Sequence, residues 1–237
     1  MIETFIALLF AHIMADFVTQ TKWMVWNKRS AFVFLLHGVH VLGFSLLAVG
    51  WAWSWPIAVL VVAHLAIDRA KLAFGDGVKP FLGDQALHVL TILAVSVISP
   101  TLWADGIWPR LFPPDALAWI LSGWVFIGGA VVTIRVGGFF VGKLLSPMAR
   151  TDFQDASLPN AGAMIGALER AIVFGLILAN QITGIAFLIA AKSILRFDAA
   201  SKDRKLAEYV LIGTLASVGW AMAAGFATRH LLQLIAG

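Results

Sequence analysis

Histidine and aspartate recur at helical spacing in the first 88 residues of the chain, which hold five of its six histidines. His12 precedes Asp16 by four positions, and His64 precedes Asp68 by the same interval. Side chains four residues apart lie on one face of an α-helix. Imidazole nitrogens and carboxylate oxygens are ligands that Zn²⁺ and similar divalent ions prefer. We therefore interpret eight residues as candidate metal ligands: His12, Asp16, His37, His40, His64, Asp68, Asp84 and His88.

The composition indicates a membrane protein. Of the 237 residues, 60% are hydrophobic and 13% are charged, and the mean hydropathy is +0.89. A water-soluble domain of this size is less apolar. The chain has no cysteine, which excludes disulfides, thiolate metal sites and a cysteine nucleophile. The pI near 9.7 does not indicate nucleic-acid binding, because Lys and Arg lie at the ends of apolar stretches, as membrane topology requires.

Apolar stretches predict an all-α, polytopic transmembrane helix bundle of about eight spans, with the N-terminus outside. The first stretch is not followed by a small-residue cleavage site, so we expect it to be a retained span. In this topology most Lys and Arg residues lie on one face, which is therefore cytoplasmic. The predicted spans cover residues 2–18, 31–51, 54–68, 82–100, 116–136, 161–179, 183–197 and 207–234.

Three parts of the chain are expected. Residues 1–104 form a four-helix, His/Asp-bearing membrane domain of two similar hairpins. Residues 105–160 form an external loop, the fifth span and a cytoplasmic loop, and residues 161–237 form a carboxy-terminal three-helix membrane domain. One long tilted helix is an alternative for residues 161–197, but Asn180 to Gly184 favour a tight turn.

The direction of each helix predicts the depth of the candidate ligands. Odd spans run towards the cytoplasm and even spans run away from it, so four helices are expected to present two layers. An Asp at membrane depth costs roughly 2.5–3.5 kcal/mol, so several together require pairing, metal or water. The structural alternative is a polar network that only holds the helices together. The expected deep layer is His12, His40, His64 and His88, and the expected shallow layer is Asp16, His37, Asp68 and Asp84.

Four further residues near the expected cytoplasmic mouth are candidates for substrate binding: Gln20, Lys22, Lys71 and Gln85. The lysines have the charge to attract a phosphate or an anionic headgroup, and the glutamines could also orient a metal ligand. Positive-inside topology and solvation at the headgroup level are the structural alternatives.

The last spans carry a second set of charged residues. Glu169, Arg170 and Lys192 lie inside apolar stretches and predict a buried charge network. Pairing of Glu169 with Lys192, or of Glu208 with Arg196, would lower the cost of insertion. Such a network either stabilises the helices or lines a path to the metal ligands.

Several motifs in the first hundred residues resemble a bacterial membrane family, domain of unknown function 3307. The resemblance covers roughly residues 1–100, and residues 161–215 are similar to the carboxy-terminal extension of longer members. It implies a multi-pass protein of the bacterial inner membrane, but it implies no reaction. The motifs, in order, are His12-x-x-x-Asp16, Asn27-Lys28, Leu36-His37, His64-x-x-x-Asp68 and Asp84-Gln85-x-x-His88.

These residues lead us to expect a metal-dependent intramembrane enzyme, specifically a hydrolase of a lipid-linked or amphipathic substrate at the cytoplasmic leaflet. One or two divalent ions are expected, with Zn²⁺ the simplest choice for a histidine-rich site. Asp16 or Asp84 would act as the catalytic general base towards water. The expected partners are membrane lipid and an anionic substrate, with no nucleic acid, and the sequence leaves the oligomeric state open.

Two other functions use the same residues. A transporter for divalent cations or protons would need them as a transient binding site. Opposed histidines could also bind haem, although the paired aspartates suit a harder ion better.

Overall fold

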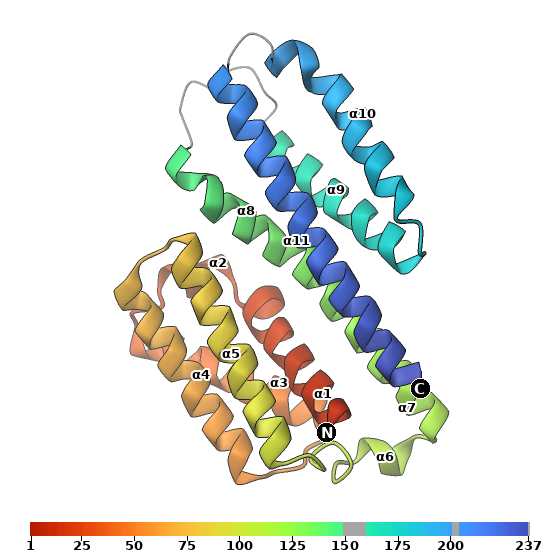
Figure 1. Cartoon of the computed structure of the whole chain (residues 1–237). Coiled ribbons are helices and arrows are strands. Elements are labelled where there is room, and N and C mark those ends of the chain that lie inside the picture. The colour runs from red at the N-terminus through yellow and green to blue at the C-terminus, as the bar shows by residue number, and fades with distance from the viewer. Residues whose placement is uncertain (149–159, 201–203, 237) are drawn as a thin grey trace. The chain divides into compact units, whose positions relative to one another are not determined.

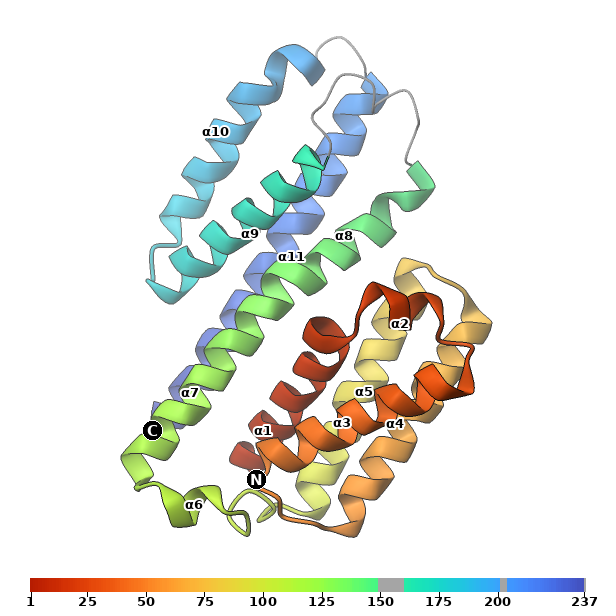
Figure 2. The same ribbon diagram turned by 180° about the vertical axis from the view of Figure 1, so that it is seen from behind.

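The computed structural model describes residues 1–148, 160–200 and 204–236, except for the side chains of residues 195–200. The described residues are helical, with turns and short connections, and contain no strand (Figures 1 and 2). The predicted all-α class is therefore confirmed. Part of the expected cytoplasmic loop before residue 160 and the side chain of Arg196 lie outside the described residues.

The chain divides into two compact units, and the first comprises Met1–Gly128 with Leu234–Gly237. Helix α1 contacts α3 and α5, and α4 contacts the same two helices, so these four helices form a closed ring around one core (Figure 1). This ring is the expected four-helix domain in outline. Its elements, with the connecting helices, are α1 Ile2–Ile13, a π-helical turn Met14–Thr19, α2 Lys22–Trp26, α3 Ala31–Ala48, α4 Trp55–Phe74, α5 Val78–Ile98, α6 Trp108–Leu111 and the first part of α7 Pro114–Val131.

The second unit comprises Gly129–Gln233. Val173 and Ile177 of α9 pack with Ile185, Val218 and Ala221 to form its core. Helices α9 and α10 are separate and meet at Asn180, whose φ is 58°, a conformation that Asn tolerates. The predicted turn is thus confirmed, and one long tilted helix is excluded. The elements are a π-helical turn Val132–Val136, α8 Gly137–Leu145, a 3₁₀ turn Ser146–Met148, α9 Ala161–Leu178, α10 Thr183–Ala200 and most of α11 Arg204–Ala236.

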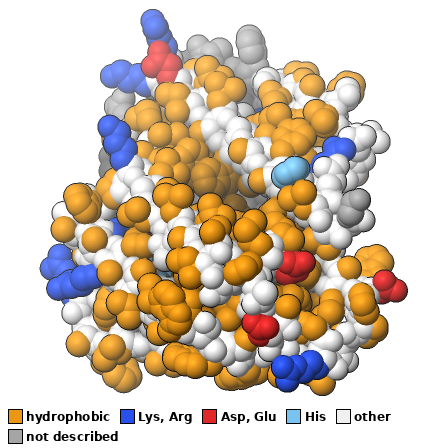
Figure 3. Space-filling view, turned by 60° about the horizontal axis from the view of Figure 1, so that its bottom comes forward, with side chains coloured by type: hydrophobic (Ala, Val, Ile, Leu, Met, Phe, Trp, Pro, Cys, Tyr) orange, Lys and Arg blue, Asp and Glu red, His pale blue; other side chains and the backbone are white. Residues whose placement is uncertain are grey.

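Six helical segments are long and apolar enough to cross a membrane, fewer than the eight spans predicted. Helix α4 carries Asp68, Arg69 and Lys71 within its last two turns, and the described apolar part of α10, Thr183–Ile194, is short. Large hydrophobic side chains remain exposed on the described helices and dominate the face in Figure 3, as a lipid-facing surface requires. The six segments are Ile2–Thr19, Ala31–Ala48, Val78–Ile98, Pro114–Met148, Ala161–Leu178 and Arg204–Ala236.

Thr4 connects the start of α1 to the loop that follows α5 through two hydrogen bonds. Its buried hydroxyl donates to the Pro100 carbonyl at 3.0 Å and accepts from the Trp103 amide at 3.2 Å. Thr4→Val keeps the shape and leaves both backbone groups unpaired, so we expect the free energy of unfolding to fall by about 1–3 kcal/mol. Thermal unfolding in detergent measures this loss. Thr101→Val, at an exposed position, is the matched control, and equal effects of the two changes would contradict the prediction.

Candidate metal centre

The π-helical turn Met14–Thr19 positions Asp16 at the cytoplasmic end expected for the first span. The Thr19 hydroxyl lies 3.1 Å from the Met14 carbonyl and 3.2 Å from the Ala15 carbonyl, so it can donate to these groups where the regular helix ends. Gln20 then adopts an extended backbone conformation, which ends the π-helical turn. A π-helical turn inserts one extra residue and re-aims the side chains around it, and such turns are frequent at functional sites.

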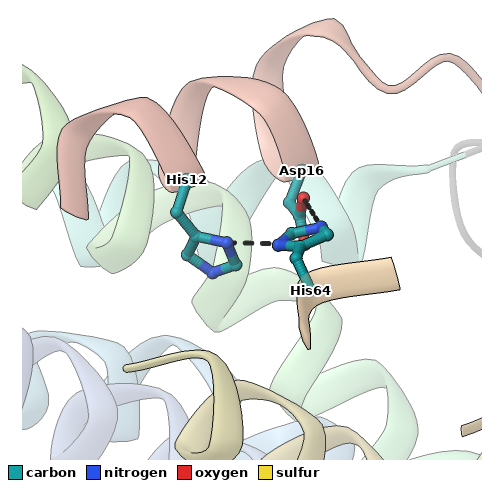
Figure 4. Close-up of side chains that lie close together, drawn as sticks. All are labelled: His12, Asp16 and His64. Atoms are coloured by element: carbon teal, nitrogen blue, oxygen red, sulfur yellow. Dashed lines mark ion pairs between the residues drawn. The ribbon is translucent and has the colours of Figure 1, made fainter. Parts of the chain in front are cut away.

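Four donor atoms from three segments, the π-helical turn, α3 and α4, converge at one point. The Nε2 atoms of His37 and His64 lie 3.1 Å apart. Asp16 Oδ1 lies 3.4 Å from His37 Nε2 and 3.2 Å from His64 Nε2. Asp68 Oδ2 lies 3.3 Å from His37 Nε2. All four side chains are at least nine-tenths buried. Figure 4 shows the rings of His12 and His64 close to Asp16, with the ion pair of each histidine to Asp16 dashed.

These separations match the edges of a metal coordination shell. A tetrahedral Zn²⁺ with ligand bonds of roughly 2.0–2.1 Å holds its donor atoms about 3.3 Å apart. Four contacts among Asp16, His37, His64 and Asp68 span 3.1–3.4 Å. Four of the six donor separations in this set therefore already have the spacing that one small divalent ion would impose.

Hydrogen bonding alone accounts poorly for this convergence. His37 Nε2 faces three acceptor-type atoms, on Asp16, Asp68 and His64, all between 3.1 and 3.4 Å away. A ring nitrogen carries at most one proton, which can point at only one of them. A cation placed among the four atoms interacts favourably with every one of them. The donor set consequently fits a divalent metal better than a set of paired hydrogen bonds.

His12 and His88 extend the cluster next to His64. Their rings are stacked with centroids 4.9 Å apart, and the ring of His88 lies 4.2 Å from that of His64. His88 Nδ1 lies 2.8 Å from the Asp84 backbone carbonyl, a bond that only a protonated Nδ1 can make. Its buried Nε2 has no hydrogen-bond partner among the described residues, and His88 joins Asp16 and Asp68 as a group of ligand atoms within 4.8 Å.

His40, expected in the deep layer, is placed differently from the other candidate ligands. Its Nδ1 lies 2.8 Å from the Leu36 carbonyl, so the ring donates within its own helix. None of the three groups of close His and carboxylate atoms found in the described part of the chain includes it. Positions three apart differ by only about 60° around a helix, so the direction of the His40 side chain, which donates to the Leu36 carbonyl, and not the helix face, separates it from the contacts of His37. His37 itself reaches His64, so the two expected layers merge into one cluster.

Two lysines form ion pairs with Asp68 and Asp84. Lys28 Nζ lies 3.2 Å from both oxygens of Asp68, and Lys71 Nζ donates to Asp84 Oδ2. Their side chains are 18% and 23% exposed, so both ammonium groups lie between the buried cluster and the surface of the protein. Lys28 was not among the predicted site residues, although its Asn27-Lys28 pair is one of the motifs quoted above.

The remaining candidates for substrate binding occupy different environments. Lys22 is exposed at the start of α2. Gln20 is half-buried, and its Nε2 has no partner among the residues that the structure describes. Gln85 donates from Nε2 to Asp84 Oδ2 at 2.9 Å, and its Oε1 lies 3.3 Å from His12 Nε2. Gln85 is thus in direct contact with His12, a candidate ligand, as the predicted role of orienting a metal ligand requires.

A small cavity lies one helical turn beyond the histidines, on the side opposite the aspartates. His12, His64 and His88 line one end of it. One aliphatic residue from each of the four helices lines it further, and all four are at least 95% buried. This aliphatic layer separates the polar cluster from the far end of the bundle; its members are Leu8, Val41, Leu60 and Ile92.

The second unit contains its own buried charges. Lys192 Nζ donates to Glu169 Oε2 at 2.6 Å, which is the first of the two expected pairs. Arg170 donates from Nε to the Ile134 carbonyl in the π-helical turn, at 3.1 Å, and from Nη1 to the Ser217 hydroxyl, at 3.1 Å. The other expected pair involves Arg196, whose side chain lies outside the described residues; Glu208 accepts from Arg204 instead.

Comparison with known proteins gives one match. Residues 4–107 match the model of a family described as "Protein of unknown function (DUF3307)". The matched segment contains α1 to α5 and all eight candidate ligands. Searches of curated proteins and of solved structures give no match. The resemblance noted from the motifs is thus confirmed for residues 4–107, which match the model of the DUF3307 family.

Proposed function

We propose that this chain is a metal-dependent intramembrane enzyme, a hydrolase of a lipid-linked or amphipathic substrate at the cytoplasmic leaflet of the bacterial inner membrane. The observation that carries the proposal is the convergence of four buried donor atoms at contact distances of 3.1–3.4 Å. Asp16, His37, His64 and Asp68 would hold one divalent ion, with Zn²⁺ the best fit to this mixed set. The bound ion would supply Lewis-acid chemistry and activate water near neutral pH.

Asp84 is the residue that we assign as general base. Its Oδ2 is occupied by Lys71 and Gln85, whereas its buried Oδ1 has no hydrogen-bond partner in the described part of the chain. Oδ1 can therefore accept a proton while the carboxylate stays fixed. Asp16, the other candidate base, lies within the proposed ligand set through Oδ1, so it is better suited to hold the ion.

The charge of the cluster favours an anionic substrate. Asp16, Asp68 and Asp84 carry three negative charges and face two lysines, Lys28 and Lys71, which leaves one net negative charge when the imidazoles are neutral. A divalent cation reverses that balance and leaves one positive charge. Phosphate or carboxylate groups of a lipid-linked molecule would then be attracted. Lys22 and Gln20, near the same end of the bundle, are proposed to contact the headgroup.

Transport of a divalent cation or of protons is the alternative, and the aliphatic layer disfavours it. A transported ion would have to pass Leu8, Val41, Leu60 and Ile92, where the lining adds only the hydroxyls of Ser45 and Thr91 and no charged ligand. Enzyme chemistry needs access from one side only. The partly exposed side chains of Lys28 and Lys71 mark the accessible end of the cluster.

Two neighbouring histidines provide a matched test of the metal site. We expect His37→Ala to lose stoichiometric metal, because His37 Nε2 touches three other donor atoms. His40→Ala should retain it, because the His40 ring donates to the Leu36 carbonyl of its own helix and not to the cluster. Elemental analysis of the detergent-purified proteins, each checked for folding by circular dichroism, gives metal per chain. Equal metal content in the two variants, or none in the wild type, would refute the proposal.

A further inference from the structure

A chain of three polar contacts connects Lys71 to His12. Lys71 Nζ donates to Asp84 Oδ2, and Gln85 Nε2 donates to the same oxygen at 2.9 Å. Gln85 Oε1 then lies 3.3 Å from His12 Nε2. Asp84 is 5% exposed and His12 is 6% exposed, so the contacts lie in a largely water-free region where polar groups need protein partners.

The charged end of this chain fixes the orientation of the Gln85 amide. A carboxylate only accepts hydrogen bonds, so Asp84 requires the NH₂ group of Gln85 on its side. A flipped amide would place Gln85 Oε1 against Asp84 Oδ2, with two acceptors in contact. Lys71 holds Asp84 in its charged form and so strengthens this preference. The amide oxygen must therefore face His12.

An amide oxygen facing His12 Nε2 determines where the imidazole proton lies. Oε1 accepts only, so Nε2 must carry the proton, and in the neutral ring Nδ1 is then a bare lone pair. His12 Nδ1 is buried, has no hydrogen-bond partner among the described residues and lies 3.8 Å from Asp16 Oδ2. Without Gln85, the nearby Asp16 carboxylate would draw the proton to Nδ1 instead.

We propose that Gln85, anchored by Asp84 and Lys71, is a positioning residue that holds His12 in the Nε2–H tautomer and keeps its Nδ1 lone pair directed at Asp16 and His64. Asp84 fixes a second histidine in the same way, because its backbone carbonyl accepts from His88 Nδ1 and leaves Nε2 bare. The adjacent residues Asp84 and Gln85 thus set the proton positions of two histidines whose rings are stacked on each other. The consequence for metal affinity rests on the proposed function; the tautomers themselves do not.

Nitrogen-15 NMR of histidine-labelled, metal-free protein in detergent tests the proposal directly. Protonated and bare ring nitrogens have different chemical shifts, and loss of a signal pair in His12→Ala assigns His12. In the wild type we expect a protonated Nε2 and a bare Nδ1. In Gln85→Met, which preserves size and removes the amide, the proton should move to Nδ1.

Two results would overturn the proposal. The first is a protonated Nδ1 on His12 of the wild type, which needs no variant to detect. The second is an unchanged His12 pattern in folded Gln85→Met. Gln233→Met, at an exposed position of α11, is the control for replacing a glutamine by methionine and should leave the pattern as in the wild type.

Titration with Zn²⁺ separates this inference from the proposed function. His12 lies 3.8 Å from the proposed ligand Asp16, and loss of an outer partner of a ligand costs about 10- to 100-fold in metal affinity, so Gln85→Met, which alters the side that His12 turns to Asp16, should bind Zn²⁺ more weakly by up to that factor. Gln233→Met should bind it as the wild type does. Wild-type affinity in folded Gln85→Met would contradict the positioning role. If the wild type binds no Zn²⁺ yet shows the expected tautomers, the metal site fails and the arrangement of His12 and Gln85 stands.

Discussion

Asp16→Asn is expected to abolish tight metal binding while leaving the helical fold in place. The change preserves size but removes the charge that His37 and His64 face at 3.4 and 3.2 Å. Outer partners of metal ligands contribute about 10- to 100-fold to affinity, so loss of a charged ligand should exceed about 100-fold. Asp16 also pairs with His12, so this one substitution alters contacts with three candidate ligands.

The stabilisation that Zn²⁺ gives the protein measures this effect. A ligand at 100 times its dissociation constant stabilises the folded state by about 2.7 kcal/mol. Wild-type protein should therefore melt at a higher temperature with Zn²⁺ than with a chelator, and Asp16→Asn should not. Asp115→Asn, at an exposed position in the first turn of α7, controls for the chemical change. A Zn²⁺-induced shift in Asp16→Asn equal to that of the wild type would show that Asp16 is not a ligand.

Lys192→Met is expected to destabilise the second unit strongly. Lys192 Nζ and Glu169 Oε2 form a 2.6 Å ion pair, and the side chains are 17% and 11% exposed. Removal of one partner leaves the other charge buried and uncompensated, at a cost of about 3–5 kcal/mol in the free energy of unfolding. Chemical unfolding in detergent, followed by circular dichroism, measures this loss.

The double variant Glu169→Leu with Lys192→Met identifies the cause. Both charges are then absent, so most of the lost stability should return, as it does when buried ion pairs are replaced by apolar residues. Arg204→Met, which removes one member of the exposed pair with Glu208, is the control and should cost less than about 1 kcal/mol. A Lys192→Met variant as stable as this control would mean that the buried pair has no structural role.

The sequence contained much of the site because helical spacing is a local property. His12 with Asp16 and His64 with Asp68 each lie one turn apart, and the closed ring of α1, α3, α4 and α5 brings the two pairs together. The turn at Asn180 was equally local, since it depends on residues that favour a left-handed backbone. These features follow from helix geometry and turn chemistry without knowledge of packing.

Features set by packing were harder to anticipate. The spacing of His37 and His40 suggested two ligands, yet only the His37 side chain is directed towards His64. Lys28 approaches Asp68 from the connection between α2 and α3, forty residues away in the sequence. The π-helical turn at Asp16 and the direction of the Gln85 amide depend on contacts that no single segment specifies. Tertiary contacts thus decide which of the candidate residues meet.

X-ray absorption at the zinc edge, on purified protein loaded with one equivalent of Zn²⁺, tests the central claim most directly. The proposed set of Asp16, His37, His64 and Asp68 predicts about four nitrogen and oxygen ligands at roughly 2.0–2.2 Å, with multiple-scattering features from two imidazoles. His37→Ala, which is expected to lose the bound ion, should give the spectrum of hydrated Zn²⁺. A spectrum of hydrated Zn²⁺ with no imidazole, identical in wild type and variant, would contradict the claim that these side chains converge on a metal ion.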